Sequence, residues 1–550
     1  MINIADLSKN TIEIKRWLEL LENRPSSFFQ YIEQYYLSDE DIFNAEKELF
    51  LKALEYSEEI YGRNEKVAIL RIPGRVNLLG MHIDHRMGSV NPIAIHNLIM
   101  VIQPRNDDKI FIYNCNPSFK PSSFSINEQL PDKKIIDWDD WTKKQLELRI
   151  QQKKSGDWVN YFQAAALYLQ NYVKSANHFF RLSGFNAVIN SSIPYAVGLS
   201  SSSSLVVGAA LTLMAINNIQ FTDQEFIDFC GTAEWYIGTR GGKGDHAAMY
   251  IGKKGNISHI SFNPFSVSYA PFPKDYCIVL CNSMVVANKI TGARSKFNAG
   301  VANYEIGFQL LKNFFPDLSH KMEYLRDVTP ERSNLPDSKI YSIIKSLPER
   351  ITRNELINQF PESIEFWEKV FSTHDKPQQG YLVRDACLYG ISECIRSEKA
   401  AEFLKNGDVL KFGELMNISH DGDRVTQKTC EKRVPYRFRA TDELIDSLIK
   451  KVSLERDNEP YKLYRQSGWY AMSCPETDEL VDISLETDGV VGARLVGAGM
   501  GGYVSVLVDK NKLKKLIARV EKIYYKPRNL TPAAEICFPV EGADFIKFEL

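Results

Sequence analysis

The sequence predicts an α+β protein of two or three domains, and three observations lead to this fold class. Its 550 residues exceed what one hydrophobic core usually organises. Short runs rich in β-branched and aromatic residues predict strands, and longer runs with apolar residues at helical spacing predict helices. The two kinds of run are mixed along most of the chain, and no internal repeat or low-complexity tract is present.

Residues 1–62 are predicted to form a helical N-terminal extension. Ile14, Trp17 and Leu21 recur at helical intervals, as do apolar residues further along the segment. Acidic residues outnumber basic ones here, which is typical of a solvated face. The sequence does not indicate the purpose of this extension.

The first domain is expected to span residues 63–288. Strands are predicted at residues 67–72, 98–103, 109–113, 185–193, 249–251, 259–262 and 276–281, and helices at residues 160–173, 205–216 and 222–231. Cys277 and Cys281 lie in the last of these strands. They are interpreted as core residues rather than zinc ligands, because no second ligand pair accompanies them.

The second domain is expected to span residues 289–550. Its composition turns helical near Lys289, and the end of the chain returns to mixed helices and strands. A helix is predicted at residues 476–487, strands at residues 493–496 and 503–508, and a helix at residues 510–524. Two charged segments with little periodicity, near residues 337–379 and 424–466, are interpreted as insertions of unknown role.

Composition argues against several classes of partner. A formal net charge of −2 provides no long-range field to attract nucleic acid or an anionic membrane, so neither is expected. The nine cysteines show no disulfide framework, which indicates reduced thiols. The start of the chain lacks a secretory signal, and no apolar run approaches the roughly 20 residues needed to cross a bilayer. We therefore expect a cytoplasmic protein, either a monomer or a homodimer.

A serine-rich loop opens one of the predicted helices. Pro194 ends the preceding strand, Gly198 permits a close approach of backbone to ligand, and serines occupy residues 200–204. Unpaired backbone N–H groups at the positive end of a helix bind phosphate. No Gly-Lys-Ser/Thr follows the glycine, so this is not a Walker loop. A serine-rich N-cap on an ordinary core helix is the alternative interpretation.

Two further clusters accompany the serine loop. One reads Pro-Gly-Arg-Val-Asn-Leu-Leu-Gly-Met-His-Ile-Asp-His at residues 73–85, and the other reads Leu-Val-Gly-Ala-Gly-Met-Gly-Gly-Tyr at residues 495–503. Together, and in this order, the three clusters resemble the motifs of the GHMP small-molecule kinases, most closely the galactokinase family. The resemblance covers roughly residues 67–545 outside the two charged segments. Supporting blocks lie at residues 405–408, 412–420 and 473–480.

The resemblance implies a GHMP kinase two-domain fold. Its parts would be a ribosomal-protein-S5-like N-terminal domain and a ferredoxin-like C-terminal domain, with the active site between them. ATP is implied as the phosphoryl donor and Mg²⁺ as the metal ion. The residues implied to bind ATP are Gly198, Leu199, Ser200, Ser201, Ser202, Ser203, Gly497, Gly499 and Gly501. The alternative for the last three glycines is a simple tight turn.

Four residues are implied to carry the chemistry. Transfer of a γ-phosphoryl group needs a metal, charge neutralisation and an oriented hydroxyl. By resemblance Ser202 and Glu234 share Mg²⁺, which favours hard oxygen ligands. Asp245 accepts the proton of the attacking hydroxyl, while Arg75 holds Asp245 ionised and offsets developing charge. The alternative for Arg75 and Asp245 is a structural ion pair, and the alternative for Glu234 is a helix-surface acid. Lys243 is either a phosphate contact or a solvated loop charge.

The implied sugar site departs from the galactokinase pattern. By resemblance Asp84 binds the ring hydroxyls at C3 and C4, with His82 nearby. Met81 replaces the glutamate that accepts the C6 hydroxyl, and Phe297 replaces a tyrosine. Leaving a buried hydroxyl without a partner costs roughly 1–3 kcal/mol, so the loss of the glutamate favours a sugar altered at C6.

The run Gly-x-His-Ile-Asp-His at residues 80–85 also resembles plant galacturonokinase. His85 or Arg86 would then face a C6 carboxylate, although Arg86 has the alternative of a solvated turn residue. The sequence thus predicts an ATP-dependent sugar 1-kinase for galactose or a galactose-configured sugar, with galacturonokinase or L-arabinokinase as the alternative. A catalytically silent galactokinase-like sugar sensor is the alternative of another class, and the presence of Arg75, Glu234 and Asp245 argues against it.

Overall fold

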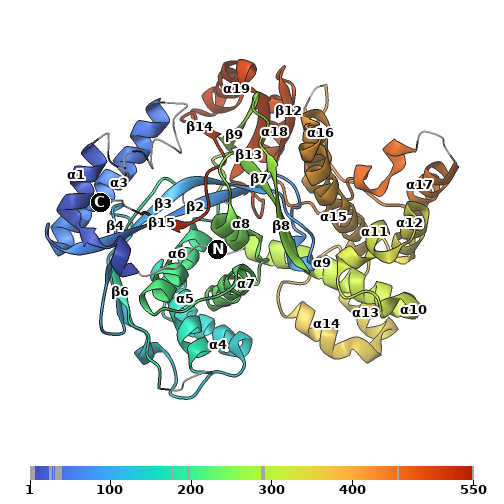
Figure 1. The fold of residues 1–550 in the computed structure, drawn as a ribbon. Coiled ribbons are helices and arrows are strands. Elements are labelled where there is room, and N and C mark those ends of the chain that lie inside the picture. Colours follow the sequence, from blue (N-terminus) through green and yellow to red (C-terminus); the bar gives the residue numbers. More distant parts are fainter. Residues whose placement is uncertain are drawn as a thin grey trace.

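A computed structural model describes residues 7–23, 26, 28, 30, 40–175, 179–194, 199–286, 292–430, 432–454 and 458–547. Within these ranges, two larger β-sheets and a group of helices pack against one another (Figure 1). No helix there is long and apolar enough to cross a membrane. Helices and antiparallel sheets occupy separate layers, so the predicted α+β class is confirmed.

The first sheet has the strand order β1-β2-β3-β6-β4-β5, and β15 adds to β2. Neighbouring strands are antiparallel, except that β4 and β6 are parallel. Its strands are β1 (Ile12–Glu13), β2 (Lys66–Asn77), β3 (Pro92–Pro104), β4 (Lys109–Asn114), β5 (Ser122–Ser125), β6 (Phe185–Ser191) and β15 (Asp544–Phe545). A separate hairpin consists of β7 (Asn256–Phe262) and β8 (Phe265–Pro271).

Side chains of β2 alternate between the two faces of the first sheet. Leu70 and Ile72 belong to the main core, whereas Val67 and Ile69 belong to a second apolar cluster on the opposite face. The N-terminal helices cover this second face (Figure 1). Trp17 Nε1 donates a 2.9 Å hydrogen bond to the Val67 carbonyl. The described helices within residues 1–62 thus bury a sheet face, and the assignment of these residues as a helical extension stays a prediction.

Helices on the main-core face carry the loops of the candidate site. They are α4 (Trp138–Gln151), α5 (Val159–Val173), α6 (Ser201–Ile216), α7 (Asp223–Ala233) and α8 (Gly244–Ile251). Among the described residues near the N-terminus, the helices that cover the second face are α1 (Ile14–Glu22) and α3 (Glu40–Tyr61). Thr222 begins α7 with a capping box, in which its hydroxyl accepts from the Glu225 N–H and the Glu225 carboxylate accepts from the Thr222 N–H.

The second sheet has the antiparallel order β12-β13-β9-β14. Its strands are β9 (Tyr276–Asn282), β12 (Val490–Leu495), β13 (Tyr503–Asp509) and β14 (Ala534–Cys537). Helices α18 (Pro475–Leu485) and α19 (Leu513–Val520) share one apolar cluster with it. Cys277 and Cys281 are buried in β9, which confirms them as core residues. Strand β9 precedes residue 288 but joins the second sheet, and β15 follows it but joins the first. The chain thus crosses twice between the two sheets, and the domain division at residue 288 stays a proposal.

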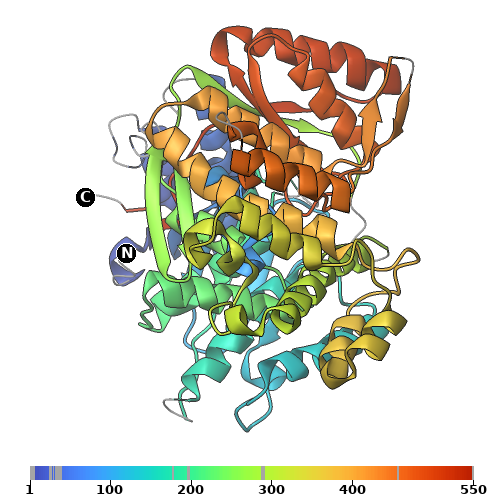
Figure 2. The same cartoon turned by 90° about the vertical axis from the view of Figure 1, so that its right-hand side faces the viewer.

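A helical part lies beside both sheets and faces the viewer in Figure 2. Its helices are α9 (Gly292–Phe314), α10 (Pro316–Ser319), α11 (Pro330–Ser333), α12 (Asp337–Ser346), α13 (Arg353–Gln359), α14 (Ile364–Phe371), α15 (Val383–Lys405), α16 (Val409–Asp423) and α17 (Asp442–Leu454). The small hairpin of β10 (Thr426–Lys428) and β11 (Arg433–Pro435) follows α16. The segments interpreted as insertions thus contain several helices, and Ile340 and Trp367 within them are fully buried.

One predicted strand is wrong. Met249–Ile251 ends α8, whose side chains from His246 to Tyr250 are all buried. A segment that is apolar on all sides shows no periodicity that separates a short helix from a strand. The other strands and the helices predicted in both domains are confirmed, with differences of a few residues at their ends.

Candidate active site

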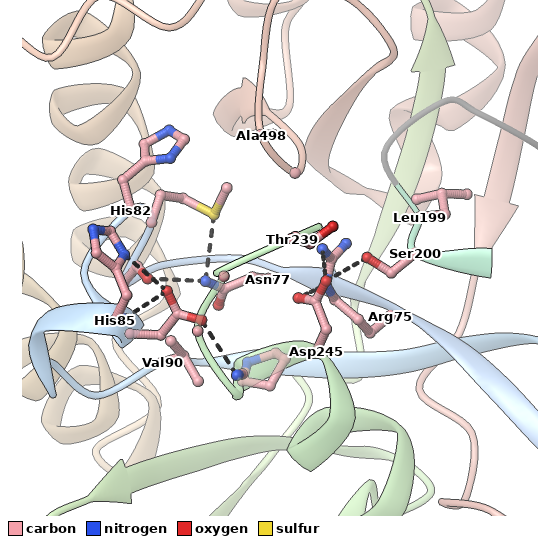
Figure 3. Close-up of a pocket in the computed structure, with 18 of the residues that line it drawn as sticks. Arg75, Asn77, His82, His85, Val90, Leu199, Ser200, Thr239, Asp245 and Ala498 are labelled. Carbon is pink, nitrogen blue, oxygen red and sulfur yellow. Dashed lines mark hydrogen bonds and ion pairs between the residues drawn. The ribbon is translucent and has the colours of Figure 1, made fainter. Parts of the chain in front are cut away.

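One cavity collects most of the residues that the sequence indicated (Figure 3). Its wall combines the end of β2, the loop that follows, the start of α6, the glycine-rich segment before α8 and the turn between β12 and β13. The assigned residues that line it are Arg75, Met81, His82, Asp84, His85, Leu199, Ser200, Ser201, Ser202, Glu234, Asp245, Phe297 and Gly497. The unassigned ones are Asn77, Gly80, Val90, Pro92, Thr239, Gly241, Gly242, Gly244 and Ala498.

Arg75 and Asp245 form a bidentate ion pair in this cavity (Figure 3). Arg75 Nε lies 2.6 Å from Asp245 Oδ1, and Arg75 Nη2 lies 2.7 Å from Asp245 Oδ2. Burial raises the pKa of Asp245, but Arg75 and a hydrogen bond from Ser200 outweigh burial and hold that pKa below its ordinary value. The side chain of Asp245 keeps 33 % exposure. Asp245 is therefore an ionised and accessible carboxylate, suited to accept a proton.

The start of α6 borders the same carboxylate. Ser200 has a left-handed backbone conformation, with φ of 55°, and its hydroxyl donates to Asp245 Oδ2. Ser201 and Ser202 begin the helix and line the cavity. The first N–H groups of a helix lack intrahelical partners and favour negative charge, so this edge of the cavity suits phosphate. Gly198, assigned to the same loop, lies outside the described residues.

Glu234 stands beside the serines as the candidate metal ligand. Its Oε1 accepts a 2.8 Å hydrogen bond from Ser203, and its Oε2 lies 3.6 Å from His246 Nε2. Ser203 is buried against Glu234, whereas Ser202 and Glu234 both line the cavity. Their hard oxygen atoms fit Mg²⁺, provided that water and phosphate oxygens complete its shell. The described residues contain no cluster of three or more His, Cys, Asp or Glu that could hold a metal without such help.

A glycine-rich segment holds Asp84. The Gly244 N–H donates to Asp84 Oδ2 at 3.2 Å, and the His85 N–H donates to Asp84 Oδ1 at 3.0 Å. Burial raises the pKa of Asp84, but the imidazole of His85 and the Gly244 N–H outweigh burial, so the pKa lies below its ordinary value. A Cβ at Gly242 would lie only 1.9 Å from Asp84 Oδ2. Sequence analysis noted these glycines but did not reveal their contact with Asp84.

Met81 and His82 form the other end of the cavity. Met81 is 5 % exposed, and its Sδ accepts a weak 3.3 Å hydrogen bond from Asn77 Nδ2. His82 stacks on Tyr470 with 4.7 Å between ring centroids, and its Nε2 lies 3.4 Å from Asp423 Oδ1. This end of the cavity thus presents a thioether and an imidazole.

His85 and Arg86 differ in their relation to the cavity. His85 lines it, with Nδ1 3.5 Å from Asp84 Oδ1, and burial lowers the pKa of its imidazole. Arg86 forms a 3.1 Å ion pair with Glu305, and it is not among the described residues that line the cavity. Of these two side chains, the neutral imidazole of His85 is therefore the one that lies nearer to the cavity. Phe297, on α9, lines the same cavity with a half-buried side chain.

The turn between β12 and β13 approaches the cavity through Gly497 and Ala498. Gly499 and Gly501 have positive φ values of 83° and 136°, and they pack on other backbone. A Cβ at Gly499 would lie 2.0 Å from the Met472 carbonyl oxygen. These two glycines shape the turn, while Gly497 faces the cavity.

Lys243 pairs with Asp228 through its Nζ, at 2.5 Å from Asp228 Oδ1. Both side chains are partly exposed, at 33 % and 43 %. The ion pair directs the ammonium toward α7, on which Asp228 lies. From the sequence, Lys243 is interpreted either as a phosphate contact or as a solvated loop charge. This geometry favours the loop charge, with Asp228 as its partner.

Three protein-family models match the chain. The model for the GHMP kinases N terminal domain covers residues 160–253, the galactokinase galactose-binding signature covers residues 58–103, and the model for the GHMP kinases C terminal covers residues 458–526. The first contains Asp245 and the second contains Arg75, so the matched segments meet in the cavity. The chain has the N- and C-terminal domains of the GHMP kinases.

Curated galactokinases resemble this chain over most of its length. The galactokinase of Dictyostelium discoideum is 25% identical over 492 residues, covering 88% of this chain and 89% of the relative. The galactokinase of Chloroflexus aurantiacus is 28% identical over 470 residues, covering 85% of this chain and 90% of the relative. The crystal structure of Lactococcus lactis galactokinase complexed with galactose has a TM-score of 0.60 at 22% identity, covering 90% of this chain and 100% of that one. This similarity confirms the GHMP kinase fold with its N- and C-terminal domains.

Proposed function

We propose that this GHMP kinase transfers the γ-phosphoryl group of ATP to the anomeric hydroxyl of galactose or of a galactose-configured sugar. The bidentate pair of Arg75 and Asp245 carries the proposal, because it places an ionised base and a fixed cation beside a helix N-terminus. The segment matching the galactose-binding signature supplies the wall that contains Met81 and Asp84. The similarity to curated galactokinases supports the sugar class.

Each group then has a role that its position allows. Asp245 accepts the proton of the sugar hydroxyl as the hydroxyl oxygen attacks phosphorus. Arg75 keeps Asp245 ionised and offsets the charge that develops on the transferring group. The hydroxyls of Ser201 and Ser202 and the N–H groups of α6 orient the phosphates. Mg²⁺, held by Ser202 and Glu234, would supply neutralisation of phosphate charge when bound.

Six sugars test this proposal in an ADP-release assay with ATP and Mg²⁺. Galactose, galacturonate, L-arabinose and D-fucose share the galactose configuration and differ at C6, whereas glucose and mannose do not share it. We expect turnover with one or more of the first four and little with the last two. Sugar binding without any ADP release would support a sugar sensor, and acceptance of glucose or mannose alone would contradict the proposed substrate class.

Replacing Met81 with glutamate is expected to improve the use of galactose relative to sugars altered at C6. A carboxylate at this position accepts a hydrogen bond from a C6 hydroxyl, which the thioether serves poorly. The gain is about 1–3 kcal/mol, which is about 5- to 150-fold in relative kcat/KM. Competition between galactose and L-arabinose or D-fucose measures this ratio. Met81→Gln is the matched control, since it adds an acceptor without a charge. An unchanged preference in Met81→Glu would refute our account of this end of the cavity.

Replacing Gly242 with alanine is expected to raise the sugar KM about tenfold, because the new methyl group displaces the carboxylate of Asp84. Steady-state kinetics with the best sugar measures the effect. Gly241→Ala is the matched control, since a Cβ there meets nothing closer than Thr239 Cγ2 at 3.6 Å. Equal KM values in the two variants would show that the packing of this segment on Asp84 does not govern sugar binding.

A further inference from the structure

A buried carboxylate from the helical part holds the loop that follows β2. Glu393 lies on α15, and its Oε1 accepts hydrogen bonds from the backbone N–H groups of Gly80, at 2.9 Å, and Met81, at 3.0 Å. We call residues 80–87 the sugar loop, since Met81, His82, Asp84 and His85 within it line the cavity. Glu393 itself is fully buried, and it contacts the backbone of the loop without lining the cavity.

The same face of α15 makes further contacts just beyond the sugar loop. Asn91 Nδ2 donates to the Ser397 carbonyl at 3.0 Å and to Ser397 Oγ at 2.8 Å. Ser89 Oγ donates to Glu398 Oε1 at 2.6 Å. Residues four apart share a helix face, so the face of α15 that holds Glu393 and Ser397 follows the chain from the sugar loop to β3.

Two buried guanidinium groups fix the orientation of the Glu393 carboxylate. Arg396 Nε lies 2.7 Å from Glu393 Oε2, and Arg494 Nη1 lies 3.6 Å from Glu393 Oε1. Ser419 Oγ donates to Glu393 as well, at 2.8 Å from each oxygen. All of these side chains are fully buried. Burial raises the pKa of Glu393, but Arg396 and Arg494 outweigh it and hold that pKa below its ordinary value.

A second carboxylate extends the cluster toward the side chain of His82. Arg494 Nη2 lies 3.5 Å from Asp423 Oδ2, and Asp423 Oδ1 lies 3.4 Å from His82 Nε2. Two carboxylates thus face two guanidinium groups, without exposure to solvent. Buried ion pairs stabilise a fold little more than well-packed apolar residues do. A gain in fold stability is therefore a weak explanation for the presence of this buried cluster. The placement of the sugar loop explains it better.

We propose that Glu393 is a positioning residue, which sets the position of the sugar loop through the Gly80 and Met81 N–H groups and thereby governs sugar affinity. This inference rests on the proposed function, because it takes the cavity end at Met81 and Asp84 as the sugar site. Glu393 lies behind the loop, so its effect on the sugar passes through the loop backbone. The nucleotide end of the cavity, at Ser200 to Ser202, has no described hydrogen bond to Glu393.

Two variants of Glu393 separate positioning from charge balance. Glu393→Asp keeps the charge that faces Arg396 and Arg494 but withdraws the carboxylate from the loop by one methylene. Glu393→Gln keeps the reach but loses the charge. We expect both variants to raise the sugar KM about tenfold, since a charge-assisted bond to the loop is lost or weakened in each. The ATP KM and kcat should change by less than about threefold.

Asp385→Asn is the matched control on the same helix. Asp385 is buried, and its Oδ1 accepts a 2.7 Å hydrogen bond from the Ala440 N–H, a contact that asparagine can keep. This variant also exchanges a buried carboxylate for an amide, and it should leave the sugar KM unchanged. A wild-type sugar KM in a folded Glu393→Asp variant would overturn the inference, because charge balance alone would then explain Glu393.

Hydrogen exchange of the wild-type chain supplies a measurement that needs neither variants nor turnover. The Gly80 and Met81 amides lie outside helices and strands, yet we expect them to exchange slowly, because their acceptor is buried and fixed. Rapid exchange at both amides would overturn the inference. This test remains valid if no sugar is turned over, so failure of the inference is distinguishable from failure of the proposed function.

Discussion

Replacing Asp245 with asparagine is expected to lower kcat by about 10²–10⁴-fold, the range that general-base catalysis contributes. The amide keeps the shape of the side chain but cannot take the proton of the sugar hydroxyl. Arg75 loses its ionised partner in the same change, while the sugar loop and α6 keep their other contacts. ADP release under saturating ATP and sugar measures kcat, and calorimetry measures binding of both ligands.

Asp228→Asn is the control for this prediction. Asp228 is a partly exposed carboxylate paired with Lys243, close to the same glycine-rich segment, and it does not line the cavity within the described residues. Its variant should keep wild-type kcat within about threefold. An Asp245→Asn variant that binds both ligands and turns over at the wild-type rate would contradict the role of Asp245 as base.

Replacing Arg75 with methionine is expected to lower kcat by about 10²–10³-fold, the loss typical of one electrostatic contact to the transition state. A change in the pH profile should accompany this loss. Arg75 holds the pKa of Asp245 below its ordinary value, and the base must be ionised to act. Removing Arg75 raises that pKa, so the acidic limb of kcat/KM should move to higher pH, with activity lost first on the acid side.

Arg105→Met is a closely matched control for Arg75. Arg105 pairs with Asp107 in the same bidentate geometry, at 2.6 Å and 2.7 Å, but on the protein surface. Its removal should leave both kcat and the pH profile unchanged. If Arg75→Met lowered activity without any shift of the acidic limb, Arg75 would act on the phosphoryl group alone, and its control of Asp245 ionisation would be refuted.

Much of the fold was predictable because its elements bury one face or are apolar throughout. The mostly apolar run of β2, which is buried on both faces of the sheet, and the long apolar run of α6 are of this kind. The prediction failed at Met249–Ile251, since residues 246–250 of α8 are all buried and too few to show a period. The helices near residues 337–379 were missed because they are short and bury few residues each. Their packing against other helices, rather than local pattern, stabilises them.

The site was predictable where its residues lie in motifs and hidden where tertiary contacts create it. Arg75 and Asp245 stand in two motifs and meet in one ion pair, although 170 positions separate them. Glu393 lies 313 positions from Gly80, and nothing in its helical surroundings distinguishes it from a surface acid. The contact between Gly242 and Asp84 is likewise invisible until two loops are brought together. Sequence motifs therefore indicate the groups that react, and the fold reveals the groups that position them.

The most direct test of the central claim is the structure of the product. After incubation of the wild-type chain with ATP, Mg²⁺ and the best sugar from the panel, phosphorus and proton NMR identify the hydroxyl that carries phosphate. The account predicts a sugar 1-phosphate, with phosphorus coupled to the anomeric proton, and no such product from Asp245→Asn. Phosphate on any other hydroxyl, or the same product from Asp245→Asn at the wild-type rate, would contradict it.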